Sequence, residues 1–208
     1  MTQKKRYLLK EIADFLALEM RGDGECEING LGTLTGASST HLSFLSNKSY
    51  IDQLDASSAG AVIVAEEFLD RCPGNALVSS NPYVSFAQAT ALFLPEPGFA
   101  TGVHASAVVA DDVVIPATAS IAPNVVIESG VQLGEGARIG AGCFIGQGSS
   151  LGANCTLHSG VTLYHGVALG DNVIIHSGTV IGADGFGFAF DGEKSIKIHQ
   201  LGGVEIGD

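Results

Sequence analysis

Residues 131–170 read VQLGEGARIGAGCFIGQGSSLGANCTLHSGVTLYHGVALG, and an aliphatic residue stands at every sixth position of this stretch. The full series is Val103, Val109, Ile115, Ile121, Ile127, Leu133, Ile139, Ile145, Leu151, Leu157, Leu163, Leu169, Ile175 and Ile181. A helix repeats at about 3.6 residues and a strand at 2, so a period of six fits neither alone. Six residues form one flat side of a coil, and three sides close a triangular coil of about eighteen residues. The series therefore predicts a parallel β-helix.

The positions around each aliphatic residue carry further information. Two residues before it, from Ala107 to Thr179, stands a small or β-branched residue, which suits a tight inward corner. Cys143 and Cys155 occupy this position, and with no CxxC pair in the chain we expect them to be buried free thiols. A glycine often follows the aliphatic residue, as at Gly146, and we expect such glycines to adopt positive φ.

Residues 1–101 lack the six-residue period and predict a separate α/β domain, followed by the β-helix over 102–208. The expected elements are a helix over 7–16 stopped by glycines at 22–24, strands over 41–45, 60–65 and 76–79, a helix over 82–92 and a linker over 95–98.

Composition narrows the class of protein. The net charge is −12, and no basic cluster exceeds Lys4-Lys5-Arg6, so a nucleic-acid or anionic membrane surface is not expected. The first twenty residues carry charges throughout, unlike a signal peptide. No run approaches the roughly twenty apolar residues of a membrane span. We therefore expect a cytoplasmic protein with no membrane span.

The hexad series is interrupted after Ile181 by nineteen extra residues, which predicts a loop over about 183–202. Within it Phe186, Phe188 and Phe190 alternate, so an extended chain places all three on one face. Two interpretations stay open: that this face borders a substrate cleft, or that it packs against a neighbouring subunit.

One short cluster in the first domain has chemistry of its own. Phe44, Asn47 and Tyr50 follow one another at intervals of three. Two aromatic rings can stack a nucleobase while the amide binds its edge. The alternative is that Phe44 belongs to the core and Tyr50 packs on the surface.

The histidines of the chain give weaker evidence for a metal site or a catalytic base. His158 and His176 are eighteen residues apart and so are expected to stack one coil above the other. Such a pair can bind a metal ion or lie unliganded at a solvent-facing corner. We expect no metal site. His165 is a distant candidate for a catalytic base.

Four segments give the chain a specific resemblance: SFLSNKSY at 43–50, NPYVSFAQA at 81–89, IGADGFGFAF at 181–190 and KIHQLG at 197–202. With the hexads, they resemble the UDP-3-O-acylglucosamine N-acyltransferases. The resemblance implies a left-handed β-helix. It also implies an enzyme of lipid A biosynthesis, which transfers a 3-hydroxyacyl chain from acyl carrier protein to the 2-amino group of a UDP-3-O-(3-hydroxyacyl)glucosamine.

The resemblance also implies roles for residues. Phe44 and Tyr50 would sandwich uracil, Asn47 would contact it, and Lys197 and Gln200 would reach toward the UDP moiety. The family's base is a histidine of a later coil, so we expect no catalytic residue within this stretch, and further coils beyond Asp208, where a hexad is incomplete. No cofactor is implied, and the family assembles as a homotrimer.

Two other functions remain to be separated from this one. The related O-acyltransferases that act on UDP-GlcNAc begin their hexads near the N-terminus and lack a first domain of this kind. A non-catalytic β-helical scaffold would need neither the aromatic–amide cluster nor the long insertion. We therefore expect the N-acyltransferase.

Overall fold

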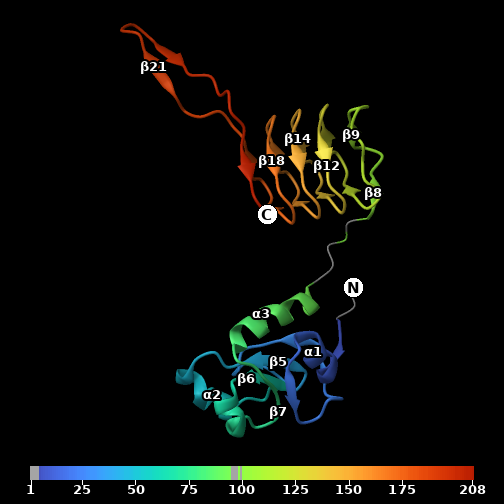
Figure 1. Cartoon of the computed structure of the whole chain (residues 1–208), viewed down its shortest axis with the longest axis vertical. Helices are drawn as coiled ribbons and strands as arrows, with labels where there is room; N and C mark the ends of the chain where they lie inside the picture. The colour runs from blue at the N-terminus through green and yellow to red at the C-terminus, as the bar shows by residue number, and fades with distance from the viewer. Residues whose placement is uncertain (1–4, 95–97, 99) are drawn as a thin grey trace. The chain divides into compact units, whose positions relative to one another are not determined.

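The computed structural model describes residues 5–94, 98 and 100–208. The chain forms two compact units, Met1–Glu96 and Pro97–Asp208, each with its own hydrophobic core (Figure 1). Of the linker expected over 95–98, residues 95–97 lie outside the described part.

The first unit is built on a five-stranded sheet. In sheet order its strands are β2 (Glu19–Arg21), β7 (Asn75–Val78), β6 (Ala61–Val64), β5 (His41–Phe44) and β4 (Gly30–Leu31). β4, β5, β6 and β7 are parallel, and β2 is antiparallel to β7. Two further short strands, β1 (Tyr7–Leu8) and β3 (Glu27–Ile28), pair with each other. Parallel strands end at a common edge, so the loops after β5, β6 and β7 lie near one another.

Helices bury both faces of this sheet. They are α1 (Leu9–Leu16), α2 (Ile51–Asp55), α3 (Pro82–Phe93) and the 3-10 helices η1 (Lys48–Tyr50) and η2 (Glu66–Arg71). Ala61 and Ile63 of β6 pack with residues of α1 and α3, whereas Val62 and Val64 pack with Leu54 of α2. Because β6 is covered on both sides, its sequence is apolar at all four positions.

The expected elements of this unit are largely present, with one correction. The strands expected over 41–45, 60–65 and 76–79 correspond to β5, β6 and β7, and α3 begins at Pro82 as predicted. The predicted range of the first helix was wrong at its start and right at its end, since α1 covers Leu9–Leu16, but the glycines at 22–24 do not stop it. Tyr7 and Leu8 pair with strand β3, and the helix is capped by Ala17, whose φ of 52° is left-handed. Its N–H bonds the carbonyls of Ala13 and Asp14, so the chain turns before the glycines at 22–24.

The second unit is a parallel β-helix with three sheets. The first sheet contains β8 (Gly102–Val103), β10 (Ser120–Ile121), β13 (Arg138–Ile139), β16 (Thr156–Leu157) and β19 (Ile174–Ile175). The second contains β9 (Val108–Val109), β11 (Val126–Ile127), β14 (Phe144–Ile145), β17 (Thr162–Leu163) and β20 (Val180–Ile181). The third contains β12 (Gln132–Leu133), β15 (Ser150–Leu151), β18 (Ala168–Leu169) and β23 (Glu205–Ile206).

The ladder register confirms the predicted coil. Ile139 pairs with Leu157, and Leu157 pairs with Ile175, each eighteen residues on. These aliphatic side chains and the small residues two positions earlier form one continuous buried core. Cys143 and Cys155 are buried free thiols, as predicted. Their Sγ atoms donate to the carbonyls of His158 and Gly170, and burial raises the pKa of both thiols.

The prediction of positive φ after the aliphatic residue holds at Gly182, whose φ is 84°, but not along the rest of the coils. Gly146 does not have positive φ. A Cβ at Gly146 would lie 2.6 Å from the carbonyl carbon of Tyr164 in the next coil, so the glycine permits close backbone stacking. In most coils positive φ occurs three residues after the aliphatic residue, at Asn124, Gly130, Gly136, Gly142, Gly148, Asn154, Gly160, Gly166, Asn172 and Gly178. Asparagine and glycine share this position because both tolerate left-handed backbone.

The insertion leaves the coil as a β-hairpin. β18 pairs with β23, so Leu169 lies beside Ile206 and the residues between β20 and β23 are looped out. β21 (Phe188–Phe190) and β22 (Ser195–Lys197) pair in antiparallel fashion and project from the coils of this unit (Figure 1).

Candidate functional site

The predicted aromatic–amide cluster lies at the carboxyl edge of the first unit's sheet. Phe44 is the last residue of β5, and the exposed Asn47 precedes the 3-10 helix that ends with Tyr50. Phe44 is half-buried, while Tyr50 is half-exposed at 50%. This edge, outside the ends of parallel strands, is where open α/β sheets bind ligands.

Asn47 has a fixed orientation. Its Oδ1 accepts hydrogen bonds from the backbone N–H of Ser49 at 2.9 Å and from Ser49 Oγ at 2.8 Å. Because a backbone N–H can only donate, the oxygen of the carboxamide must face Ser49. Among the described residues the Asn47 Nδ2 has no hydrogen-bond partner. The amide nitrogen of the exposed Asn47 is therefore free to donate a hydrogen bond. A carbonyl oxygen on a bound ring would be a suitable acceptor.

The Phe44 ring is supported by two aromatic residues from α3. It stacks on Phe86 with ring centroids 4.2 Å apart and on Tyr83 at 5.6 Å. Phe44 thus contributes to the core as well as to the edge, and no ring contact between Phe44 and Tyr50 is present in the described part of the chain. Tyr83 remains 64% exposed. Sequence reasoning missed Tyr83 and Phe86. Their spacing of three in NPYVSF, at the start of a predicted helix, was the available signal.

α3 is held at this edge by polar contacts near its first turn. The Asn81 side chain accepts a hydrogen bond from the backbone N–H of Val84 at 3.3 Å and so caps the helix. Ser79, just after β7, shares a hydrogen bond of 2.8 Å with Ser85. These contacts fix the N-terminal turn of α3, and with it the positions of Tyr83 and Phe86.

Lys197 and Gln200 lie in the second unit, at the base of the inserted hairpin. Lys197 pairs with Asp184, and this lysine holds the pKa of the Asp184 carboxyl below its ordinary value. Gln200 Oε1 accepts the backbone N–H of Gly185 at 3.2 Å, and its Nε2 donates to the carbonyl of Gly202 at 3.2 Å. Both side chains brace the base of the hairpin.

The histidines of the second unit occupy its surface. His165 is exposed. It lies close enough to Asp184 to lower the pKa of the Asp184 carboxyl electrostatically, although the effect of Lys197 is larger. His158 and His176 stack with ring centroids 5.3 Å apart and an interplanar angle of 6°, as their spacing predicted. Among the described residues no group of three or more His, Cys, Asp or Glu side chains is arranged to hold a metal ion.

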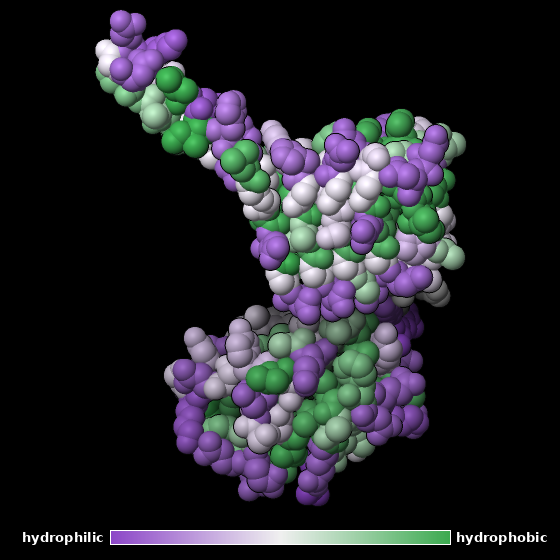
Figure 2. All heavy atoms as spheres, turned by 45° about the horizontal axis from the view of Figure 1, so that its top comes forward, coloured by the Kyte–Doolittle hydropathy of each residue, from purple (hydrophilic) through white to green (hydrophobic). Residues whose placement is uncertain are grey.

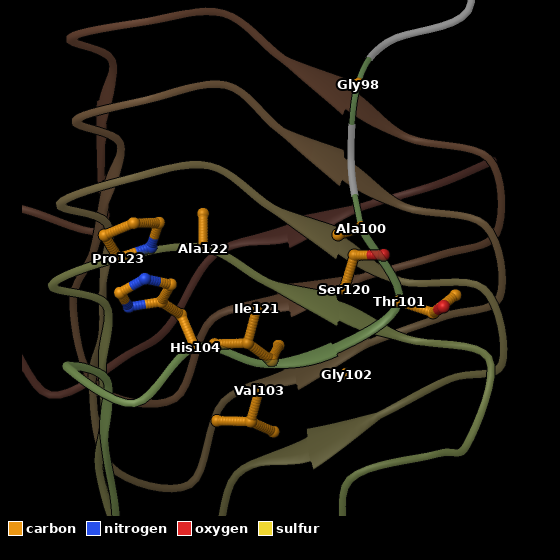
Figure 3. A pocket seen from close by; sticks show the side chains of 10 residues that line it. All are labelled: Gly98, Ala100, Thr101, Gly102, Val103, His104, Ser120, Ile121, Ala122 and Pro123. Atoms are coloured by element: carbon orange, nitrogen blue, oxygen red, sulfur yellow. The ribbon is translucent and has the colours of Figure 1, made fainter.

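The described part of the second unit contains a cavity and an open groove. A cavity of about 330 Å³ is lined by Gly98, Ala100, Thr101, Gly102, Val103, His104, Ser120, Ile121, Ala122 and Pro123 (Figure 3). An open groove of about 420 Å³ is lined by Val108, Val109, Ala110, Val126, Ile127, Glu128, Ser129 and Gln147. Neither contains a predicted site residue.

Comparison with known proteins gives separate matches for the first and the second unit. The family described as UDP-3-O-(3-hydroxymyristoyl) glucosamine N-acyltransferase, LpxD, matches residues 25–92, which include the Phe44–Tyr50 segment. The chain resembles the UDP-3-O-acylglucosamine N-acyltransferases, as its motifs predicted. Bacterial transferase hexapeptide repeats match residues 112–147 and 148–183, and the hexapeptide repeat of succinyl-transferase matches 130–165. The predicted α/β domain with a left-handed β-helix is thereby confirmed.

Curated relatives extend the similarity along the chain. A UDP-3-O-acylglucosamine N-acyltransferase of Pseudoalteromonas translucida is 56% identical over 205 residues, which is 98% of this chain and 60% of the relative. Those of Alcanivorax borkumensis and Pseudomonas putida are 53% and 46% identical over 96% of this chain. The chain spans 57–60% of the length of these relatives. Among the described residues, no helix is both long enough and apolar enough to cross a membrane.

Proposed function

We propose that the chain belongs to an N-acyltransferase of lipid A biosynthesis. Its substrates would be a 3-hydroxyacyl chain on acyl carrier protein and the 2-amino group of UDP-3-O-(3-hydroxyacyl)glucosamine. The observation that carries the proposal is the orientation of Asn47, whose Oδ1 is held by Ser49 so that its amide nitrogen is free to donate, in a segment that matches the family model. Relatives named for this activity match 96–98% of the chain.

The first unit would bind the uridine. Phe44 and Tyr50 supply two aromatic surfaces for a planar ring, at about 1–3 kcal/mol for each stacked base. Asn47 Nδ2 would donate to a ring carbonyl. Tyr83, which stacks on Phe44 and is itself exposed, extends the aromatic surface at the same edge. Lys197 and Gln200, on the second unit, are the proposed contacts to the UDP moiety.

The transfer itself needs a base. The amine nitrogen attacks the thioester carbonyl, loses a proton to the base, and the carrier thiol leaves with a proton as the amide forms. The proposed base is a histidine of a coil beyond Asp208, with His165 as the second candidate. No cofactor is required by this chemistry.

The proposed setting is a homotrimer in the cytoplasm, with acyl carrier protein as the donor. Self-association is supported by exposed apolar side chains on the second unit, among them Val108 and Phe190. The net charge of −12 argues against nucleic acid as a partner.

The experiment is a transfer assay on two proteins: the chain itself, and the chain joined to the C-terminal part of the Pseudoalteromonas translucida relative. Each receives 3-hydroxyacyl carrier protein with either UDP-3-O-acylglucosamine or UDP-GlcNAc. The proposal predicts that the fusion protein converts UDP-3-O-acylglucosamine into a product whose new amide bond resists mild base. A base-labile ester from UDP-GlcNAc would favour an O-acyltransferase, and no transfer or UDP binding by either protein would favour a scaffold.

A further inference from the structure

The exposed Tyr83 lies against a ring of the candidate site. Hydrophobic side chains reach the surface of both units (Figure 2), and Tyr83 is 64% exposed. Its ring stacks on Phe44 with centroids 5.6 Å apart and an interplanar angle of 30°. Phe44 is one of the two rings proposed to sandwich the uracil. The position of Tyr83 therefore affects how a base reaches Phe44.

Phe44 lies between two rings that come from α3. Phe86 stacks on Phe44 at 4.2 Å with an interplanar angle of 27°, which is closer than the stack of Tyr83. A phenyl ring has two faces, and two rings stacked on the same face would also contact each other. Among the described residues, Tyr83 and Phe86 make no ring contact with each other. Phe86 therefore lies on one face of Phe44 and Tyr83 on the other.

Of these two rings, only that of Tyr83 is free to leave Phe44. Phe86 is partly buried and packs with the core of the first unit. The backbone around Tyr83 is held in place, because the Asn81 side chain caps α3 and a buried hydrogen bond of 2.8 Å joins Ser79 to Ser85. In the described part of the chain, no hydrogen bond holds the Tyr83 hydroxyl. Exposed side chains change rotamer within nanoseconds, so the Tyr83 ring can move while its backbone stays fixed.

A base that stacks on Phe44 needs the ring face that Tyr83 covers, because Phe86 occupies the other face from within the core. The incoming base would replace one aromatic stack on Phe44 by another. Stacking of a base on an aromatic side chain is at least as favourable as a pair of aromatic side chains. Tyr50, half-exposed at 50%, would add a second stacking surface for the base. A planar base can therefore displace Tyr83, whereas a ligand without a planar ring gains no stacking energy with which to do so.

We propose that Tyr83 is a specificity-determining residue of the uridine site. In the free chain its ring covers the Phe44 face that stacks the uracil, and only a ligand with a planar base displaces it. The inference rests on the proposed uridine site and adds a displaceable ring to it. Because displacement costs free energy, Tyr83 weakens UDP binding, and removal of its ring should strengthen it. A Tyr83 ring that packed on the bound uracil as a further wall would have the opposite effect.

The first test is calorimetric titration of UDP into the unaltered chain and into the Tyr83→Ala variant. The variant should bind UDP about two- to tenfold more tightly, which is the equivalent of one aromatic pair. Val84→Ala, at the neighbouring exposed position of α3, is the matched control and should bind UDP as the unaltered chain does. A Tyr83→Ala chain with an unchanged circular dichroism spectrum that binds UDP equally or more weakly overturns the proposal.

The decisive test observes the Tyr83 ring directly and needs no substitution. The chain has four tyrosines and no tryptophan, so selective labelling of tyrosine and phenylalanine rings gives a simple aromatic NMR spectrum. In the free chain, the ring protons of Tyr83 should show nuclear Overhauser contacts to those of Phe44. At saturating UDP these contacts should disappear, while those between Phe86 and Phe44 remain.

Inorganic pyrophosphate is the control ligand, because it has the charged part of UDP without the base. It should leave the contacts between Tyr83 and Phe44 in place, and their loss with pyrophosphate alone overturns the proposal. Saturable UDP binding with these contacts retained also overturns it, but leaves the uridine site standing. A folded chain that binds no UDP overturns both the uridine site and the role of Tyr83 in it.

Discussion

Asn47 accepts the backbone N–H of Ser49 at 2.9 Å, and this one bond decides which end of the asparagine carboxamide is available to a ligand. The oxygen is used within the turn, so the amide nitrogen is the group that can reach a nucleobase. The account of the first unit as a uridine site depends on this assignment.

The Asn47→Asp variant separates the structural role of this side chain from the binding role. A carboxylate still accepts both hydrogen bonds from Ser49, so the free energy of unfolding should change little. It cannot donate to a ring carbonyl, and UDP affinity should fall by roughly 1–3 kcal/mol. Calorimetric titration with UDP and denaturant unfolding measure the two quantities. Loss of stability with retained affinity would mean that Asn47 serves the turn alone.

Phe44 is predicted to affect both stability and binding. Phe44→Ala removes the ring that stacks on Phe86 at 4.2 Å, and since Phe44 is half-buried we expect a loss of about 1–3 kcal/mol of stability. UDP affinity should fall by about 1–3 kcal/mol with the fold intact. Phe15→Ala, on an exposed aromatic outside this cluster, is the control and should leave UDP binding unchanged. Equal UDP affinity in the Phe44→Ala and unaltered chains would remove Phe44 from the site.

The two classes of glycine in the β-helix should respond differently to substitution. Gly146→Ala places a Cβ 2.6 Å from the backbone of the next coil, so the coils must separate locally, at a cost of about 2 kcal/mol or more. Gly142→Asn puts asparagine at φ 69°, where Asn124 and Asn154 already stand, and nothing lies within 4 Å of the new Cβ. It should be nearly neutral. Thermal unfolding of both variants checks this, and equal destabilisation would contradict the assignment.

The ion pair at the base of the hairpin predicts a pH effect. Lys197 lowers the pKa of Asp184 from its ordinary value of about 3.8, so this contribution to hairpin order is present at neutral pH. It is lost as the pH falls through the lowered folded-state pKa, when Asp184 becomes protonated. Lys197→Met should raise the pKa of Asp184. NMR titration of the Asp184 carboxyl carbon measures this pKa. In the matched control Lys194→Met, Asp184 should titrate as in the unaltered chain; an identical upward shift in both variants would exclude a specific effect of Lys197.

The sequence predicted the β-helix well because each hexad repeats one physical requirement. Ile139, Leu157 and Ile175 stack in register, and the small residues before them are buried, as the spacing indicated. The reason for Gly146 could not be found from the sequence, because the obstacle is the backbone of Tyr164 in another coil. The six-residue period shows which positions repeat, but it does not show which atoms of the next coil lie against each position.

Only part of the candidate site could be predicted from the sequence. Phe44, Asn47 and Tyr50 form a local cluster, whereas Tyr83 and Phe86 join it only because α3 returns to the end of β5. The outward row of the sheet that contains β9, β11, β14, β17 and β20 has a similar origin. Its members, such as Val126 and Phe144, are eighteen residues apart and become neighbours only when the coils stack. Tertiary pairing, not local spacing, creates both surfaces.

The central claim is tested most directly by calorimetric titration of UDP into the unaltered chain, with the Asn47→Asp variant beside it. The account predicts saturable binding at one site per chain, and a marked loss of affinity in the variant without loss of stability. A chain that is folded by circular dichroism and releases no heat of UDP binding at any concentration would contradict it.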